Sequence, residues 1–301
     1  MTTATKHISV CVCTYKRPDS LKRLLEELRK QDASGPFTYS IVVADNDHLR
    51  SAEPVILQWS AGSTIPIKYC MEPRQNIALA RNKAIENARG DFIAFIDDDE
   101  FPARTWLSSL FKTCEEYKVD GVLGPVRRHF DEQPPKWIAK SQLYERRINP
   151  TGLKVVWQEA RTGNVLLKRQ VFGTDERPFR PEFRAGEDQD FFRRKIEQGC
   201  TFIWCADALV YEVVPPARWA RKYMLRKALL RGATARLQPS CGALSIAKSL
   251  IAVPSYLLAL PFAFLIGHHW FMTLLVKLFD HLGKVLAVLG INPISEQYVT
   301  E

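Results

Sequence analysis

The most informative stretch of the sequence is Phe92-Ile93-Ala94-Phe95-Ile96-Asp97-Asp98-Asp99-Glu100. Five apolar residues run directly into four acids, which predicts a buried strand whose carboxyl end delivers a cluster of negative charge. Open parallel sheets bind their ligands at that edge. Four adjacent carboxylates repel one another unless a cation or a ring of donors neutralises them. We therefore expect a hard divalent ion, Mg²⁺ or Mn²⁺, that bridges to a nucleotide diphosphate; a solvated acidic turn is the simpler alternative.

The chain on both sides of this stretch alternates strand and helix patterns. Strands are predicted at 7–13, 39–44, 65–71, 92–96 and 121–126, and helices at 19–30, 52–60, 76–88 and 103–117. This alternation predicts a doubly wound, Rossmann-like α/β domain with a mixed sheet. The chain has no glycine-rich phosphate loop of the dinucleotide or P-loop kind, which argues against a dehydrogenase or an ATPase.

Polar side chains follow three of the predicted strands at the point where each strand ends. Thr14, Tyr15 and Arg17 follow the first strand, Asp45 ends the second, and the Asp97 cluster ends the fourth. Because the carboxyl ends of parallel strands meet at one edge of a sheet, these groups are expected to form a row that fits a nucleotide. Ordinary turn packing is the alternative for Thr14 and Tyr15.

Five segments together carry a resemblance to a known family. They are Val12-Cys13-Thr14-Tyr15-Lys16-Arg17-Pro18, Val43-Ala44-Asp45-Asn46, Asn76-Ile77-Ala78-Leu79-Ala80-Arg81-Asn82, Gly90 to Glu100, and Gly186-Glu187-Asp188-Gln189-Asp190-Phe191-Phe192. In order and spacing they resemble the motifs of family 2 glycosyltransferases of GT-A fold, over about residues 7 to 235. Within that family the chain is similar to bacterial exopolysaccharide glucosyltransferases of the succinoglycan type.

The resemblance implies a role for each matching position. Thr14, Tyr15, Arg17 and Asp45 would lie at the nucleotide, and Arg81 near the diphosphate. Asp97 and Asp99 would be the aspartates of the DXD motif around the metal and the ribose, and Asp98 between them would also contact the donor. Asp188 would be the general base, which inverting transfer requires near the acceptor hydroxyl. Glu187 and Asp188 also start a predicted helix, so an N-terminal capping pair is the alternative.

The pattern departs from the family at one position. Many relatives have a metal-binding histidine shortly before a proline, where this chain has Tyr211 in the segment Leu209 to Pro215. Glu212 is a candidate oxygen ligand in its place, unless the aspartates and the nucleotide hold the metal by themselves. Asn164 begins a short apolar strand close to where the resemblance places the donor sugar, and it is a further candidate contact.

The positive charge of the chain is concentrated after the predicted catalytic domain. The net charge is +9, and residues 216–248 contain eight basic and no acidic side chains. This segment is expected to be a basic helix; Arg226 and Arg231 are candidates for clamping the leaving diphosphate, while the other basic residues face anionic lipid or solvent. Residues 249–276 then lack Asp, Glu, Lys and Arg. As one helix they would extend about 42 Å, enough to cross a bilayer.

Pro254, Pro261 and Gly267 interrupt this apolar run, so a kinked helix, a re-entrant hairpin, helices in one leaflet and a buried core helix all stay open. The expected domains are therefore a GT-A domain at 1–215, a basic helical segment at 216–248 and a hydrophobic membrane-associating tail at 249–301. Positive charge before the apolar run favours the cytoplasmic side of the plasma membrane. Seven cysteines without metal spacing indicate reduced thiols, in agreement with that compartment.

These observations predict an inverting, metal-dependent hexosyltransferase. The expected donor is a nucleotide sugar, UDP-glucose by resemblance, and the expected acceptor is a polyprenyl-diphosphate-linked oligosaccharide in bacterial surface or exopolysaccharide synthesis. Transfer to polyprenyl phosphate is one alternative. A noncatalytic, basic membrane-binding protein with a degenerate nucleotide fold is another. A nucleic-acid partner is not expected, because such a protein has no use for Asp97 to Asp99 converging with Asp188 or for an apolar tail.

Overall fold

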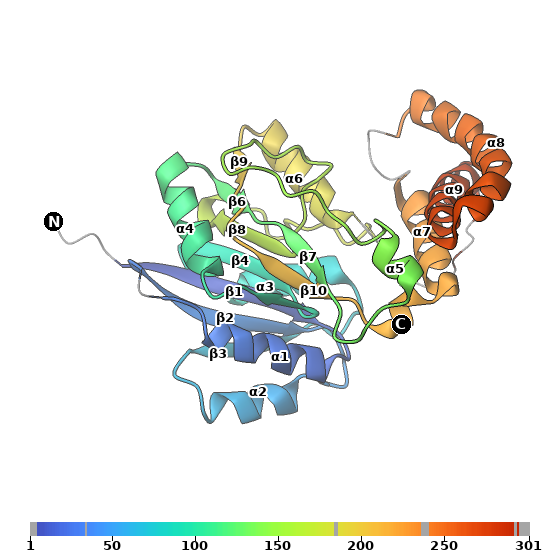
Figure 1. Ribbon diagram of the computed structural model, residues 1–301. Coiled ribbons are helices and arrows are strands. Elements are labelled where there is room, and N and C mark those ends of the chain that lie inside the picture. The colour runs from blue at the N-terminus through green and yellow to red at the C-terminus, as the bar shows by residue number, and fades with distance from the viewer. Residues whose placement is uncertain (1–4, 34, 184–185, 236–240, 292–293, 295–301) are drawn as a thin grey trace. The chain divides into compact units, whose positions relative to one another are not determined.

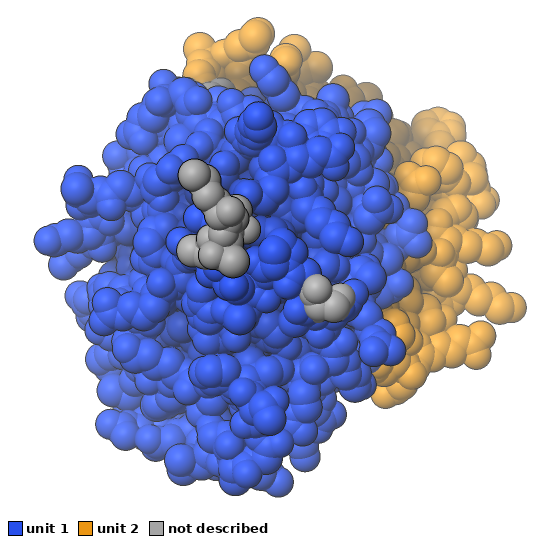
Figure 2. Space-filling view, turned by 90° about the vertical axis from the view of Figure 1, so that its left-hand side faces the viewer, with its two compact units in different colours: residues 1–127, 146–182, 187–212 blue, residues 128–145, 183–186, 213–301 orange. Residues whose placement is uncertain are grey.

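The computed structural model describes residues 5–33, 35–183, 186–235, 241–291 and 294. These residues form two compact units, coloured separately in Figure 2. Unit 1 comprises residues 1–127, 146–182 and 187–212, and unit 2 comprises residues 128–145, 183–186 and 213–301. The second unit therefore takes two short segments from the middle of the chain in addition to the C-terminal region.

Unit 1 is built on a seven-stranded mixed sheet with the order β3-β2-β1-β4-β8-β6-β9 (Figure 1). The first four strands in this order are mutually parallel, and β8 runs antiparallel to both of its neighbours. The strands are β1 (Lys6–Thr14), β2 (Phe37–Asp45), β3 (Ile67–Met71), β4 (Phe92–Asp97), β6 (Gly121–Leu123), β8 (Asn164–Lys168) and β9 (Phe202–Trp204). This is the predicted doubly wound α/β fold.

Helices cover both faces of this sheet, so its central strands are apolar throughout. Ile8, Val10 and Val12 of β1 pack with α1, α2 and α4, whereas Cys11 of β1 packs on the other side with α3 and α6. A strand that is buried on both faces needs a continuous apolar run rather than an alternating one. The helices are α1 (Pro18–Arg29), α2 (Glu53–Ser60), α3 (Ile77–Asn87), α4 (Trp106–Tyr117) and α6 (Glu187–Glu197).

We call Asp97 to Glu100, where β4 ends and β5 (Glu100–Pro102) begins, the acidic turn. A second sheet of three short strands follows it. The strand order of this sheet is β5, β10 (Val210–Val213) and β7 (Val126–His129). The prediction of a single strand at 121–126 was wrong: β6 ends at Leu123 and β7 begins at Val126. Pro125 cannot donate to a ladder, and a Cβ on Gly124 would lie 2.1 Å from the carbonyl oxygen of Ala208. The chain therefore changes sheets at Gly124 and Pro125.

Unit 2 contains four α-helices in its described part. They are α5 (Lys136–Lys140), α7 (Arg221–Ala235), α8 (Ala243–Ile266) and α9 (His268–Val288). Met224 and Ala228 of α7, Met272 and Val276 of α9, and Ile138 of α5 form its apolar core. The described residues also form two short 3₁₀ helices, one in each unit, at Arg169–Phe172 and Pro216–Trp219.

The apolar run expected at 249–276 is divided between two helices. Gly267, at φ +156°, separates α8 from α9, whereas Pro254 and Pro261 lie inside α8 without ending it. In the part of the chain that the structure describes, α8 is the one helix long and apolar enough to cross a membrane, by length and composition. The structure thus has two helices joined at Gly267 where the sequence shows one uncharged run.

Candidate active site

The first and fourth strands bring the predicted donor-site residues to the same edge of the sheet. Cys13 of β1 pairs with Asp97 of β4, and Thr14 pairs with Asp45 of β2. The hydroxyl of Thr14 donates to Asp98 over 2.7 Å. The Nη1 atom of Arg17, at the start of α1, donates to Oδ1 of Asp98 and to Oδ2 of Asp99, over 3.2 Å in each case. The acidic turn is therefore held by a ring of donors from the loop after β1.

These donors offset only part of the burial and mutual repulsion that disfavour the ionised carboxylates of the turn. Burial raises the pKa of Asp98 to about 7; Asp99 adds to this rise, and Arg17 and Thr14 oppose it. Desolvation likewise raises the pKa of Asp97 to about 6, because Arg81 does not fully balance the burial and the negative charges of Asp99 and Glu212. The turn keeps excess negative charge, which a divalent cation would neutralise.

Arg81 connects the acidic turn to helix α6. It lies on α3, its side chain is 8% exposed, and it forms an ion pair with Glu187 of α6. Its other terminal nitrogen lies 3.7 Å from Oδ1 of Asp97. Burial by itself would lower the pKa of Arg81, but Glu187 and Asp97 outweigh burial and raise the pKa. The guanidinium therefore stays charged between the two carboxylates.

Helix α6 presents three acidic side chains in its first turn, in three different environments. Glu187 pairs with Arg81. Asp190 is fully buried and is bonded to Arg193 and Arg194, both at 2.9 Å. Asp188 accepts a hydrogen bond from the backbone N–H of Gln189, and no described lysine or arginine pairs with it. Among the described residues, two of the acids are thus paired with arginines, whereas Asp188 is not.

Helix α3 also fixes the segment that precedes α6. The side-chain amide of Asn82 donates to the carbonyl of Phe179 and accepts from its N–H, at 2.7 and 3.0 Å. Asn76, which caps α3, donates to the carbonyl of Pro181 at 2.8 Å. The ring of Phe179 also stacks with the guanidinium of Arg81, 5.6 Å from its centroid. One helix thus positions both the acidic turn and the approach to Asp188.

The small sheet brings Glu212 to the acidic cluster. Pairing of β10 with β5 places Glu212 directly opposite Glu100. Two like charges in such a pair are unfavourable, and Arg146 offsets them through an ion pair with Glu212 at 2.9 Å. Burial, Asp97 and Glu212 raise the pKa of Glu100, which accepts a hydrogen bond from the backbone N–H of Asp97. Tyr211, at the position of the family histidine, stacks on Phe101 with centroids 5.2 Å apart.

Five further predicted site residues lie in other surroundings. Asp45 is buried and its carboxylate accepts from the N–H of Asp47, the N–H of Ala52 and the hydroxyl of Tyr69. Asn164 is 2% exposed. Its side-chain amide accepts a hydrogen bond from the indole N–H of Trp106 and donates to the carbonyl oxygens of Pro125 and Ala208. In unit 2, Arg231 pairs with Asp280 through two hydrogen bonds, and Arg226 is half-buried on the same helix. Tyr15 is half-buried beside Lys16, whose ammonium lies 5.2 Å from its ring.

The predicted metal ligands fit a hard cation whose coordination shell is completed by oxygen atoms of the substrate. Among the described residues, no three His, Cys, Asp or Glu side chains gather closely enough to hold a metal by themselves. Mg²⁺ and Mn²⁺ in nucleotide sites need only one or two carboxylates, because phosphate oxygens and water supply the rest. The side chain of Asp97 is 45% exposed and that of Asp99 is 16% exposed, so Asp97 is the more accessible of the two oxygen donors.

Sequence reasoning missed several residues of this site. The pairing of Glu100 with Glu212 and that of Arg81 with Glu187 join segments far apart in the chain, and no local pattern indicates them. Gly163 is another: a Cβ there would lie 2.8 Å from Oε1 of Glu100 and 3.0 Å from Oδ2 of Asp97. The glycine is required because the carboxylates approach its backbone. Its place just before a predicted strand at the site was the available signal.

Known proteins with similar sequences and folds are glycosyltransferases. Residues 9–175 match the family model described as glycosyl transferase family 2. The chain is 32% identical over 236 residues to the succinoglycan biosynthesis protein ExoM of Rhizobium meliloti, a match that covers 78% of this chain and 75% of that protein.

Two solved structures show the fold. The mannosyltransferase PcManGT from Pyrobaculum calidifontis, in complex with GDP-Man and Mn²⁺, aligns with a TM-score of 0.63 at 18% identity over 94% of this chain and 88% of that one. TarS 1–349 of S. aureus, in complex with UDP, aligns with a TM-score of 0.53 at 19% identity over 74% and 65% of the two chains. Together with the strand order and the acidic turn after β4, these matches show that the chain is an enzyme of glycosyltransferase family 2 with the GT-A fold.

Proposed function

We propose that this glycosyltransferase transfers a hexose, glucose from UDP-glucose, with inversion to a polyprenyl-diphosphate-linked oligosaccharide during bacterial surface or exopolysaccharide synthesis. The single observation that carries the chemistry is the chain of contacts from Asp97 through Arg81 to Glu187, the neighbour of Asp188. It joins the acidic turn to the start of α6 within one compact unit. The similarity to ExoM, named for succinoglycan biosynthesis, supports a role in exopolysaccharide synthesis.

On the donor side, Asp97 and Asp99 would hold Mg²⁺ or Mn²⁺, and Glu212 is the third candidate ligand. The cation would neutralise the diphosphate as it leaves. Thr14 and Arg17 hold the acidic turn in place through Asp98, and Asp45 fixes the loop between β2 and α2, so these residues shape the nucleotide site. Tyr15 is available to stack on the base. Arg81 keeps its positive charge beside Asp97 and can approach the diphosphate.

On the acceptor side, Asp188 would act as the general base. It accepts the proton of the attacking hydroxyl as that oxygen bonds to the anomeric carbon and the nucleotide diphosphate leaves from the opposite face. The first turn of a helix stabilises an ionised carboxylate, which keeps such a base deprotonated near neutral pH. Base assistance of this kind contributes roughly 10²- to 10⁴-fold to the rate. Glu187 and Asp190 fix the orientation of this turn through their arginines.

We place the enzyme at the cytoplasmic surface of the plasma membrane, where nucleotide sugars and lipid-linked acceptors meet. Unit 2 supports this placement, because it combines basic residues with the apolar helix α8. Confinement to the plane of the acceptor raises its local concentration without any new contact in the site. Arg226 and Arg231 stay candidates for diphosphate contact, although Arg231 would then exchange its bonds with Asp280.

The test is a matrix of donors and acceptors. The purified full chain is incubated with UDP-glucose, UDP-N-acetylglucosamine or GDP-mannose, with and without Mg²⁺ or Mn²⁺, and with a polyprenyl-diphosphate glycan or polyprenyl phosphate. We expect nucleotide release with UDP-glucose, a divalent cation and the diphosphate-linked glycan, and a product with inverted anomeric configuration. Transfer to polyprenyl phosphate alone would favour that alternative. Absence of release with every donor would refute the proposed donor and acceptor.

A further inference from the structure

Helix α8 carries an apolar surface that the other described residues of unit 2 leave uncovered. The side facing α9 is buried at Ser249 and Ala263. The outer side is exposed and entirely apolar over its C-terminal half: Leu258 is 75% exposed, Phe262 is 68% exposed and Leu265 is 81% exposed. Spacings of four and three residues place these three side chains on one face of the helix. We call Leu258, Phe262 and Leu265 the outer face of α8.

Helix α9 runs antiparallel to α8 and is tied to it along its length. His281 contacts Ser249 at 3.0 Å, Lys284 donates to Ser245 at 3.1 Å, and at the other end of the pair Phe264 packs against Phe271. This pairing places the charged groups of α9, which are Lys277, Asp280 and Lys284, beside the N-terminal half of α8. The two helices therefore form one packed hairpin whose turn is at Gly267.

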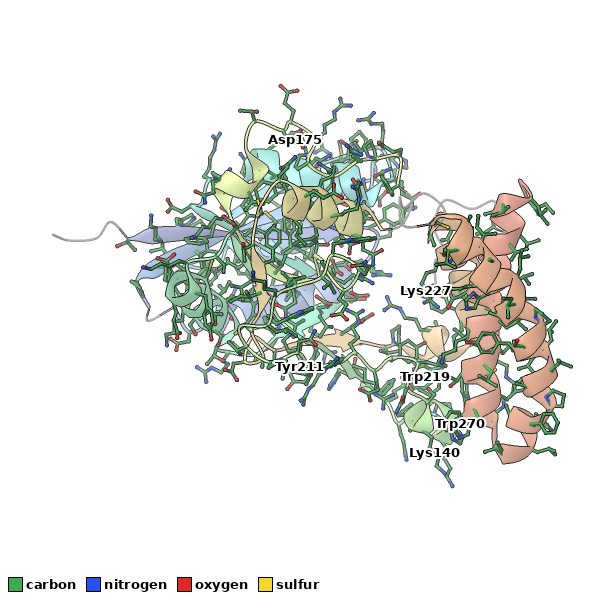
Figure 3. All side chains as sticks on the ribbon, turned by 90° about the horizontal axis from the view of Figure 1, so that it is seen from above. Lys140, Asp175, Tyr211, Trp219, Lys227 and Trp270 are labelled. Atoms are coloured by element: carbon green, nitrogen blue, oxygen red, sulfur yellow. The ribbon has the colours of Figure 1, made fainter. Side chains whose placement is uncertain are left out.

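Helix α7 lies along the same α9 and runs in the same direction. Arg221 contacts His268 at 3.2 Å near the turn of the hairpin, and Arg231 pairs with Asp280 further along. The backbones approach so closely that a Cβ on Gly232 would lie 2.0 Å from the carbonyl oxygen of Asp280. Near the turn, the ring of Trp137, next to exposed Lys136, packs on His268, and Lys140 and Trp270 lie in the same region (Figure 3).

This packing decides how an apolar helix of sufficient length can meet a membrane. A helix of 24 residues extends about 36 Å, which exceeds a hydrocarbon core of about 30 Å. If α8 crossed, however, α9 and α7 would have to enter the hydrocarbon with it or separate from it. Entry would bury Lys277, Lys284 and the exposed Arg221, Lys222 and Lys227, which is strongly unfavourable. Separation would break the contacts of His281 with Ser249 and of Lys284 with Ser245, and it would expose the buried Ala263.

We infer that α8 lies in the plane of an anionic membrane surface, with its outer face in the acyl region, and that none of the described helices of unit 2 crosses the bilayer. The inference rests on the membrane association proposed above and specifies its form. Charge supports an anionic surface, because the described residues from 213 to 291 contain nine basic side chains and one acidic side chain, Asp280. Trp270, 51% exposed at the start of α9, is of the type that anchors at the headgroup level.

The first experiment tests the outer face. Full-length protein is floated with vesicles of phosphatidylcholine, with and without phosphatidylglycerol, and compared with the triple variant Leu258→Gln, Phe262→Gln, Leu265→Gln. We expect binding to the anionic vesicles and roughly tenfold or more weaker binding by the variant, since interfacial affinity scales with the apolar area buried. The matched control is Leu49→Gln, Leu57→Gln, Leu153→Gln, which changes three exposed leucines of unit 1 and should bind as the original chain does.

Equal vesicle binding by the triple variant would overturn the inference. A second result would also overturn it: the original chain does not bind vesicles but self-associates, and the triple variant does not self-associate. The outer face of α8 would then be an interface between two copies of the chain. In that second case the proposed membrane association fails as well, whereas the glycosyltransferase reaction is tested separately with a soluble acceptor.

The second experiment tests whether the helix crosses. Cysteines are introduced at exposed positions in the first turn of α8, at its end and after α9, as Leu244→Cys, Ile266→Cys and Leu289→Cys. Each variant also carries Cys13→Ser, Cys200→Ser and Cys241→Ser, which remove the partly exposed native thiols. Spheroplasts that express each full-length variant are treated with a membrane-impermeant maleimide before or after permeabilisation. We expect no labelling of any variant in intact spheroplasts and labelling of Leu244→Cys and Leu289→Cys after permeabilisation. Labelling of Ile266→Cys or Leu289→Cys in intact spheroplasts shows a crossing and refutes the inference while leaving membrane association intact.

Discussion

Replacing Asp97 by Asn is predicted to stabilise the ligand-free protein at alkaline pH while removing catalysis. Desolvation and the charges of Asp99 and Glu212 raise the pKa of Asp97 to about 6 in spite of Arg81. A carboxyl group with a raised pKa binds its proton more readily in the folded protein than in the unfolded chain. Its contribution to stability is therefore present below the unfolded pKa of 3.8 and is lost as the pH rises through about 6.

The magnitude follows from the size of the shift. Two pKa units, from 3.8 to about 6, correspond to about 3 kcal/mol at pH 8. The side chain of Asp97 is 45% exposed, so solvent screening reduces this penalty to about 1–2 kcal/mol. Asn has the same shape and carries no charge, and Arg81 keeps its ion pair with Glu187. The variant should therefore gain about 1–2 kcal/mol at pH 8, and about half of that gain should be gone at pH 5.

The assay is urea unfolding of the full-length chain in mild detergent at pH 5 and pH 8, followed by tryptophan fluorescence. The control is Asp207→Asn, which removes an exposed carboxylate in a turn and should change the unfolding free energy by less than about 0.5 kcal/mol. If Asp97→Asn is less stable than the original chain at pH 8, or if its gain does not shrink on acidification, the description of an electrostatically strained acidic turn is refuted.

Three further changes test other parts of the structure. Arg81→Gln removes one partner of a buried pair and should lower the unfolding free energy by about 3–5 kcal/mol; stability equal to that of the original chain in urea would show that the pair with Glu187 is unimportant. Gly163→Ala should weaken Mn²⁺ binding in the presence of nucleotide by roughly tenfold, because the new Cβ displaces Glu100 and Asp97, whereas Gly62→Ala, with open space around it, should bind Mn²⁺ normally. Gly283→Ala should lower thermal stability, since its Cβ would lie 2.3 Å from the carbonyl oxygen of Leu229; an unchanged melting temperature would contradict the close packing of α7 on α9.

The main sheet and its helices could be predicted because their signals are local. A continuous apolar run that ends in acids identifies β4, and a helix whose leucines share one face, with Pro18 in its first turn, identifies α1. The same rules fail where a contact joins distant segments. Pairing of β5 with β10, which places Glu212 opposite Glu100, depends on a ladder between residues more than 100 positions apart.

The positions of the site residues could likewise be predicted only where the signal is local. The positions of Thr14, Asp97 and Asp188 follow from strand ends and a helix start, which the sequence displays. The partners of Asp45 and Asn164 do not, because a buried carboxylate that holds a loop and a catalytic one have the same local pattern. Asp45 accepts two backbone N–H groups and a tyrosine hydroxyl, so only the three-dimensional structure shows how fully its oxygens are used.

The packing of the C-terminal helices could be predicted only in part, because it too depends on contacts between segments that are distant in the sequence. Composition locates the basic and apolar segments but does not specify which helices pack together. Gly232 and Gly283 allow α7 and α9 to approach each other, yet each appears in the sequence as an isolated helix-weakening residue. The recruitment of residues 128–145 into unit 2 is another contact between segments far apart in the chain.

The central claim is that Asp188 is the base of a transfer whose donor is held by the acidic turn. Its most direct test compares donor binding with transfer in Asp188→Asn, using calorimetry with UDP-glucose and Mn²⁺ and a transfer assay with the lipid-linked glycan. The predicted result is donor affinity within about twofold of the original chain, because the acidic turn is unchanged, and a loss of kcat of roughly 10²- to 10⁴-fold. Transfer at the original rate, or loss of donor binding in the folded variant, would contradict the assignment.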